Sequence, residues 1–137
     1  MNTEKQLQFV THEQAGLLRE LHFDWECNIY YTNINIDIPP WEREQAEMHF
    51  GFNKNNRKDY STCSVPTVAL ALKWLRDVQK IFSCVDFSIT SFHKGYYWRY
   101  FSFDNKDFCN KTKKLFGSYE AAESALLDEI LIQILIL

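Results

Sequence analysis

The chain has few of the residues from which recognisable active sites are built. It contains only four glycines among 137 residues, and no glycine-rich loop precedes a predicted helix, which excludes the usual phosphate-cradling loop. No serine, cysteine or threonine lies in a sequence typical of a strained strand-to-helix elbow. We therefore expect no catalytic residues and no cofactor, and an enzyme of this sequence would need a site assembled from scattered residues.

Cysteine is also sparse, and its spacing matches no known framework. The four cysteines are Cys27, Cys63, Cys84 and Cys109. They form no C-x-x-C pair and have no histidine at matching spacing, so no zinc site is expected. The first ten residues lack the apolar core of a signal peptide. We therefore expect a cytoplasmic protein whose thiols stay free.

Local clusters of polar residues are weak candidates for chemistry. No histidine has a second ligand three or four residues away on a predicted helix, which favours surface or capping roles for His12, His22, His49 and His93. Asp24 and Glu26 follow His22, but Phe23 and Trp25 between them are expected to anchor the core, so no metal site is predicted. The carboxylates Glu42, Glu44 and Glu47 are more typical of a solvated face than of paired catalytic acids.

Charge and length predict one domain spanning residues 1–137, with no strong electrostatic partner. The net charge is -3, and 46% of the residues are hydrophobic, which is enough to fill a single core. A protein that binds nucleic acid mainly through phosphates usually has a strongly basic total or face. The mild acidity of this chain therefore disfavours a nucleic-acid-binding protein, although it does not exclude a local basic patch.

The first half of the chain predicts one helix and several strands. Thr11 and Gln14 form a capping-box pattern that begins a helix running to about Leu21. Apolar alternation over 27–31 and 34–38 predicts strands, and its phase slips by one residue, so we expect a bulge or tight turn near residues 32–33.

Proline and then polar residues separate these strands from the centre of the chain. Pro39-Pro40 should end the strand because neither residue can donate a ladder hydrogen bond. A short helix over Trp41–Phe50, a surface loop over Gly51–Asp59 and a short edge strand over Tyr60–Ser64 are then expected.

The centre of the chain predicts a helix from Ser64 to Phe82. Ser64 is expected to cap it and Pro66 to lie in its first turn, where a missing N–H costs nothing. Its apolar sector is wide, which is typical of a helix packed across a sheet. The expected buried face is Val68, Ala71, Leu72, Leu75, Val78 and Phe82.

A hairpin should follow this helix. Alternation over 85–89 and 96–103 predicts two paired strands joined at His93-Lys94-Gly95. We expect Tyr96, Trp98 and Tyr100 to face the core. The second face then carries Tyr97, Arg99, Phe101 and Phe103.

A polar turn over Asp104–Leu115 should lead to a last helix capped by Ser118. Its expected buried stripe is Tyr119, Ala122, Leu126, Ile130 and Ile134. The end of this helix, Ile130–Leu137, is apolar except for Gln133 and is far too short to span a bilayer. It should either insert into the core or contact another copy of the chain.

The second face of the hairpin is the main candidate for binding. Tyr97 and Phe101 flank Arg99, and Lys94 and the lysines within 111–114 lie nearby in the sequence. This mixture is typical of sheet surfaces that stack bases and contact phosphates. The alternative, favoured by the presence of two further helices, is that this face packs against one of them.

Two motifs carry a resemblance to a known group of proteins. Residues 66–76 read P-T-x-x-x-A-x-x-W-L-R, and the last helix opens with Ser118-Tyr119-Glu120-x-Ala122. The chain resembles a small uncharacterised protein family of Bacteroides-type bacteria and their prophages. The resemblance implies a phage-linked or mobile-element origin and a cytoplasmic setting, and it implies no activity.

We therefore predict an α+β fold with a mainly antiparallel sheet packed against the central and C-terminal helices. The expected function is that of a non-enzymatic accessory or binding protein acting on a protein partner, or on itself through Ile130–Leu137. The alternative is a nucleic-acid-binding module that uses Tyr97, Arg99, Phe101 and Lys94. An enzyme with a scattered site is the least favoured class.

Overall fold

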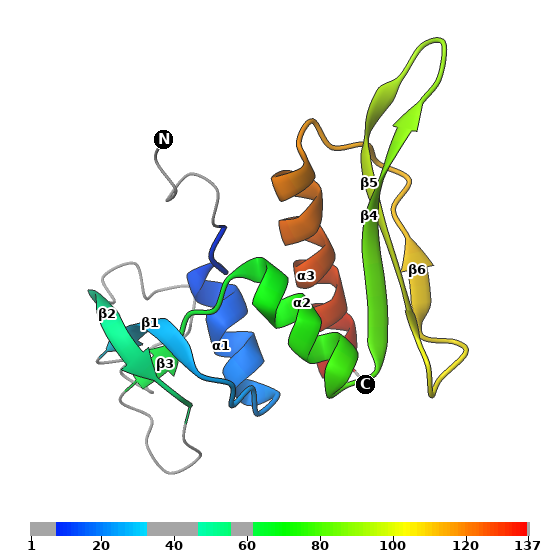
Figure 1. The fold of residues 1–137 in the computed structure, drawn as a ribbon. Coiled ribbons are helices and arrows are strands. Elements are labelled where there is room, and N and C mark those ends of the chain that lie inside the picture. Colours follow the sequence, from blue (N-terminus) through cyan, green and yellow to red (C-terminus); the bar gives the residue numbers. More distant parts are fainter. Residues whose placement is uncertain (1–7, 33–46, 56–61, 137) are drawn as a thin grey trace. The chain divides into compact units, whose positions relative to one another are not determined.

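The structure is a computed structural model that describes residues 8–32, 47–55 and 62–136. Its helices and strands follow in the order α1 (His12–Glu20), β1 (Cys27–Thr32), β2 (Glu47–Asn53), β3 (Thr62–Ser64), α2 (Val68–Asp77), β4 (Ile81–Ile89), β5 (Lys94–Ser102), β6 (Cys109–Lys111) and α3 (Tyr119–Ile136). All the strand pairs are antiparallel, and they form two three-stranded sheets (Figure 1). The predicted α+β class is confirmed.

The chain forms two compact units, Met1–Ala71 and Leu72–Leu137. In the first unit, α1 begins and ends with local hydrogen bonds. The Thr11 hydroxyl accepts from the Gln14 amide at 3.1 Å, and the Gln14 side chain accepts from the Thr11 amide at 2.8 Å, so the predicted capping box is confirmed. At the other end, His22 adopts φ 70°, and the Phe23 amide donates to the Leu18 carbonyl at 2.9 Å. This is a Schellman ending, in which buried Leu18 and Phe23 close the helix.

The first sheet has the order β2-β1-β3, with α1 against β3. The short strand β3 lies at an edge, as predicted. The helix predicted over Trp41–Phe50 is wrong at its end, because Glu47–Phe50 belong to β2, and Gly51–Asn53 also continue that strand instead of forming a loop. Lys54 and Asn55 follow β2 without helix or strand, as expected of the loop, and the rest of both segments lies outside the described residues. Of the bulge predicted near residues 32–33, Thr32 keeps the regular pairing of β1, and Asn33 lies outside the described residues. An irregularity occurs instead between Cys27 and Ile29.

The start of the central helix differs from the prediction by one turn. Ser64 ends β3, is fully buried, and accepts a hydrogen bond from the Asn53 amide group at 2.8 Å. Thr67 is the true cap, since its hydroxyl accepts from the Leu70 amide at 3.1 Å. Pro66 therefore precedes the helix, and its carbonyl accepts from the Val10 amide at 3.0 Å. Ser64 pairs with a distant strand, which the local sequence pattern does not reveal. Because its backbone is in this strand, no helix can begin there.

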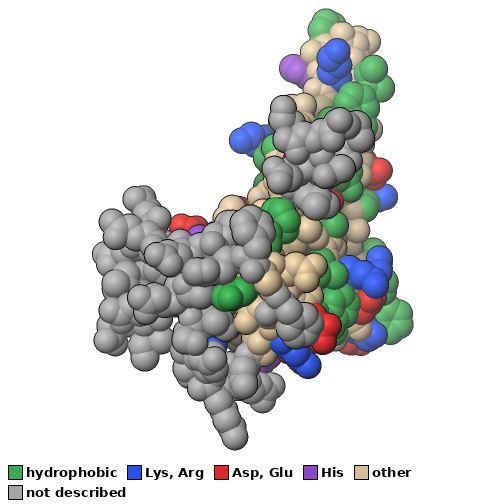
Figure 2. Space-filling model, turned by 60° about the vertical axis from the view of Figure 1, so that its left-hand side comes forward, with side chains coloured by type: hydrophobic (Ala, Val, Ile, Leu, Met, Phe, Trp, Pro, Cys, Tyr) green, Lys and Arg blue, Asp and Glu red, His purple; other side chains and the backbone are tan. Residues whose placement is uncertain are grey.

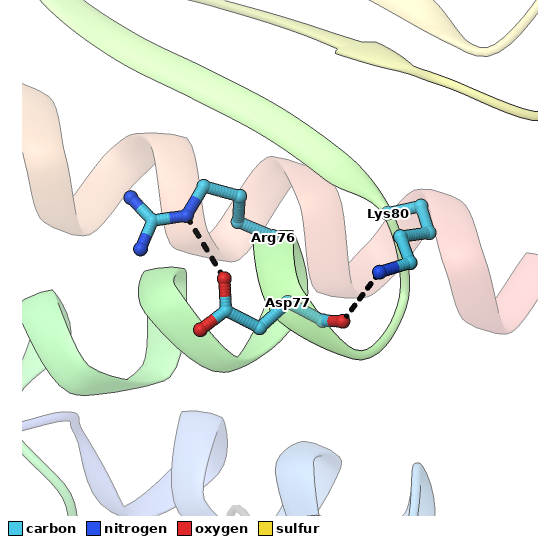
Figure 3. Close-up of polar contacts among 3 residues, drawn as sticks. All are labelled: Arg76, Asp77 and Lys80. Atoms are coloured by element: carbon cyan, nitrogen blue, oxygen red, sulfur yellow. Dashed lines mark hydrogen bonds and ion pairs between the residues drawn. The ribbon is translucent and has the colours of Figure 1, made fainter.

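The second unit begins within α2, and this helix ends earlier than predicted. After Asp77 the chain turns through Lys80, which has a left-handed φ of 58°. The Lys80 ammonium donates to the Asp77 carbonyl at 2.9 Å, beside the exposed Arg76–Asp77 ion pair (Figure 3). Phe82 therefore lies in β4 and not on the helix, and Val78 is exposed instead of buried.

The second sheet has the order β4-β5-β6 and contains the predicted hairpin. Strands β4 and β5 pair over nine consecutive positions, from Ile81 with Ser102 to Ile89 with Lys94. Lys94 and Gly95 thus belong to β5, and the connection is 90–93. The polar turn predicted over Asp104–Leu115 contains a third strand, β6.

Helix α3 packs against β4 and β5 (Figure 1). Ser118 caps it as predicted, because its hydroxyl accepts from the Ala121 amide at 3.1 Å. Trp98 and Tyr100 are buried, as predicted, and the Tyr100 hydroxyl donates to Glu129 of α3 at 3.2 Å. The buried residues of α3 are Ala122, Leu126, Leu127, Ile130 and Leu131, whereas Tyr119 is exposed and does not belong to the stripe.

Candidate interaction surface

The second sheet has one face against α3 and an opposite face that we call the outer face. In an antiparallel pair, directly opposite residues point to the same side. Arg99 is paired with Cys84 on one side and with Lys111 on the other, which places the three on the outer face. The other members from β4 and β5 are Phe82, Asp86, Ser88, Tyr97 and Phe101.

One end of the outer face is an aromatic cluster. The Phe82 and Phe101 rings are stacked with centroids 5.4 Å apart, and the Phe103 ring lies 6.5 Å from Phe82. Phe101 is 54% exposed and Phe103 is 74% exposed. Two large apolar side chains, one near the end of β5 and one just after it, are therefore held at the surface instead of being covered by α3.

The middle of the outer face is polar but internally neutralised. The Arg99 guanidinium lies 3.2 Å from the Asp86 carboxylate, and its Nε–H donates to the Cys84 sulfur at 3.1 Å. The Cys84 sulfur and then the Asp86 charge raise the pKa of Arg99 above its usual value. Because the group is exposed, this pairing adds little stability, but it directs the guanidinium along the sheet.

The lysines predicted to flank this face are divided by the structure. The Lys111 ammonium lies 4.9 Å from the centre of the Tyr97 ring, a cation–π arrangement on the outer face. Lys94 is opposite Ile89 and, by strand alternation, lies on the other side of the sheet from Tyr97. The structure therefore brings Tyr97, Arg99 and Phe101 together and separates Lys94 from them.

The tip of the hairpin is a second exposed apolar region. Strands β4 and β5 extend past the start of α3, and Figure 2 shows hydrophobic side chains along the projecting arm (Figures 1 and 2). Phe87, Ile89 and Phe92 are exposed there. The sequence pattern placed Phe87 and Ile89 in the apolar row of a strand. It did not indicate that the strands extend beyond α3, which leaves these side chains uncovered.

The end of α3 divides into a buried part and an exposed part. Ile130 and Leu131 are buried, whereas Ile132, Leu135 and Ile136 are exposed, the last by 71%. The expectation of core insertion is therefore met by the first residues of the segment only. The described remainder presents apolar side chains at the surface.

Cys27 and Cys63 are buried, and the described residues contain no metal-binding cluster. Burial raises the pKa of Cys27 to about 11, which keeps this thiol protonated and poorly nucleophilic. Within residues 8–32, 47–55 and 62–136, no group of three or more histidine, cysteine, aspartate or glutamate residues is placed to hold a metal ion. Of the predicted acidic face, Glu47 lies in β2, and Glu42 and Glu44 lie outside the described residues.

Among the described helices, none is both long enough and apolar enough to cross a membrane. Comparison with known proteins finds no matching family model, no similar curated protein and no similar solved structure. Function is therefore inferred from the surfaces described above.

Proposed function

We propose that this protein is a non-enzymatic binding protein that acts through protein contacts, with the aromatic cluster of the outer face as its main contact surface. The observation that carries this proposal is the exposure of Phe101 and Phe103, at the end of β5 and just after it, beside Phe82 of β4. Exposed apolar patches mark interaction sites, and aromatic and arginine side chains dominate the energetic centres of interfaces. The expected partner is a protein with an apolar patch of its own.

The electrostatics of the face support a protein partner. Arg99 is paired with Asp86 and Cys84, so its charge is not free to track a phosphate backbone. The local charge of the outer face is close to balanced, because Asp86 offsets one of the two cations Arg99 and Lys111. Apolar side chains bordered by mutually paired polar groups are typical of protein interfaces.

The proposal also includes the cellular setting and a second contact. The free cysteines are consistent with a reducing cytoplasm, and the motifs over 66–76 and 118–122 support an accessory role in a phage or mobile element. The exposed end of α3, at Ile132, Leu135 and Ile136, offers a further apolar surface for a partner or for self-association.

The proposal predicts that the double variant Phe101→Ser, Phe103→Ser loses its partner without losing its fold. Both rings are more than half exposed, so the melting temperature should change little, whereas truncation of two central aromatic residues should weaken binding by about tenfold or more for each. Partners are captured from a bacterial extract with the wild-type protein, purified, and titrated by calorimetry.

The matched control replaces two exposed charged residues of the neighbouring loop, Lys106→Ala and Asp107→Ala. This variant should bind like the wild-type protein. If every purified partner binds the aromatic double variant as tightly as it binds the control, the aromatic cluster is not the contact surface.

Nucleic-acid binding is a second candidate, favoured by the contact of Lys111 with Tyr97 on the same face as exposed Phe101. If it operates, single-stranded probes should bind at low salt, binding should weaken steeply as salt rises, and Tyr97→Ala with Arg99→Ala should reduce it. Fluorescence anisotropy with single- and double-stranded DNA and RNA makes the measurement. A wild-type protein that leaves the anisotropy of all probes unchanged at low salt removes this candidate.

A further inference from the structure

We infer that the free edge of β4 pairs with the β4 edge of a second copy of this chain. The two strands run antiparallel, with Val85 of one copy opposite Val85 of the other. The β4-β5-β6 sheets of the two copies then form one six-stranded sheet. This interaction uses neither Phe101 nor Phe103, so it stands or falls separately from the proposed contact on the outer face.

The hydrogen-bond phase of the hairpin determines which groups point outward. The Phe103 amide donates to the Lys80 carbonyl at 2.9 Å, and the Thr90 amide donates to the His93 carbonyl at 2.7 Å. In an antiparallel ladder these bonded pairs alternate with non-bonded pairs, so the even-numbered residues of β4 bond to β5. The odd-numbered residues, Ile81, Ser83, Val85, Phe87 and Ile89, direct their N–H and C=O groups to the free edge.

Nothing within the described residues pairs with this edge. The sheet order places β4 at an edge, and the backbone hydrogen bonds of residues 8–32, 47–55 and 62–136 include none from another segment to those five outward-pointing residues. Five donors and five acceptors therefore form a continuous template along a nine-residue strand.

The two edges of the sheet differ in how they are protected. Edge strands usually avoid pairing by being short or by carrying lysine, proline or a bulge. At one edge β6 has three residues and includes Lys111. At the other, β4 has nine residues, an unbroken register, no proline and no lysine, and Asp86 is its only charged side chain. The long edge lacks the features that prevent association.

The strand is complementary to itself. Pairing about Val85 sets Ser83 opposite Phe87 of the second copy and Ile81 opposite its Ile89, so that all the outward groups are matched. On the outer face, Asp86 then lies opposite Cys84 of the second copy and not opposite another carboxylate. No like charges are therefore opposite each other across the paired edges. A second copy of the chain is thus already complementary to this edge.

The apolar surfaces at the two ends of the unit also fit this arrangement. Helix α3 runs with β5, because Tyr119 contacts Tyr96 and Glu129 contacts Tyr100, so its end lies toward the start of β4 (Figure 1). Antiparallel pairing brings the exposed Phe87 of one copy toward the beginning of β4 in the other. The uncovered hairpin tip thus approaches the exposed end of α3, and each copy covers apolar surface that the other leaves open.

The first test measures mass by light scattering across protein concentrations. The wild-type chain of 16.3 kDa should reach twice that mass. Phe87→Pro removes an outward N–H without breaking a bond to β5 and should be monomeric with an unchanged circular dichroism spectrum. Cys109→Pro makes the same change at the outward position of β6 and should remain dimeric. A monomeric wild type, or a dimeric Phe87→Pro, overturns the proposal.

The double variant Ile132→Glu, Ile136→Glu distinguishes self-association through the end of α3 from self-association through β4. If this variant is monomeric while Phe87→Pro remains dimeric, the end of α3 drives self-association and the β4 pairing is wrong. If the wild-type chain stays monomeric but binds an extended peptide, the edge of β4 pairs with another protein. That result also overturns the proposal.

The register is tested independently of folding stability by cross-linking. In a Cys109→Ser background, Asp86→Cys places a thiol opposite Cys84 of the second copy, in a non-hydrogen-bonded pair with Cα atoms about 4.5 Å apart, which suits a disulfide. With oxidised glutathione this variant should form a covalent dimer on a non-reducing gel. Ser88→Cys in the same background lies opposite Phe82 and should not. Equal cross-linking of the two variants overturns the register.

Discussion

Replacement of Trp98 by alanine is expected to lower the free energy of unfolding by about 3–5 kcal/mol. Trp98 is buried at the middle of β5, opposite Val85, and its ring stacks with that of Tyr100 at 5.9 Å between centroids. Truncation leaves a cavity in a face that α3 cannot fully refill. Because whole domains are stable by only about 5–15 kcal/mol, the loss should be visible in urea unfolding followed by circular dichroism at 222 nm.

Two further substitutions separate packing from general damage. Phe103→Ala removes a ring that is 74% exposed and should change stability by less than about 0.5 kcal/mol. The loss of stability in Trp98→Phe should lie between those of Trp98→Ala and Phe103→Ala. The buried indole N–H meets no acceptor in the described part of the chain, so its removal eliminates an unpaired donor. A Trp98→Ala variant as stable as Phe103→Ala would show that this face is not the core of the second unit.

The second large effect is expected at Gly95, where Gly95→Ala should cost on the order of 1–3 kcal/mol. A Cβ at this position would lie 2.9 Å from the Phe116 carbonyl oxygen and 2.9 Å from the Leu115 Cβ. That segment cannot retreat freely, because Phe116 and Tyr96 exchange backbone hydrogen bonds of 2.9 and 2.7 Å. The glycine is required by close approach of the backbone and not by its own dihedral angles.

The measurement is the melting temperature together with hydrogen exchange at Tyr96 and Phe116. Both amides should exchange faster in Gly95→Ala, since the substitution forces the two segments apart. Gly117→Ala is the matched control, because a Cβ there meets nothing within 4 Å, and it should be neutral or slightly stabilising. Unchanged exchange at Tyr96 in Gly95→Ala would contradict the close approach.

Features that depend on neighbouring residues were predictable from the sequence. The capping box at Thr11 and the cap at Ser118 are correct, because the groups that satisfy the first turn lie within three residues of the cap. The hairpin is also correct, since alternation and a short connection bring adjacent strands together. Its alternation correctly grouped Tyr97, Arg99 and Phe101, and the same alternation would have excluded Lys94 from that group.

Features that depend on distant residues were not predictable. Ser64 has the local pattern of a cap, yet pairing of β3 with β1 places it inside a strand and passes the role to Thr67. Strand β6 has only three residues, too few for a recognisable alternation, and it exists because β5 offers an open edge. The pairing of Arg99 with Asp86 likewise needs the register of the hairpin, which sequence spacing does not supply.

By itself the sequence determined the α+β class, the places where α1 and α3 begin, and the strand pair at the centre of the second unit. These follow from hydrogen bonds and alternation over a few residues, which any packing must respect. Only the tertiary structure decided which apolar residues are covered. Helix α3 is positioned by packing on Trp98 and Tyr100, and it leaves Phe101, Phe103 and the hairpin tip exposed. Exposure depends on what lies opposite a side chain, and that partner is distant in the sequence.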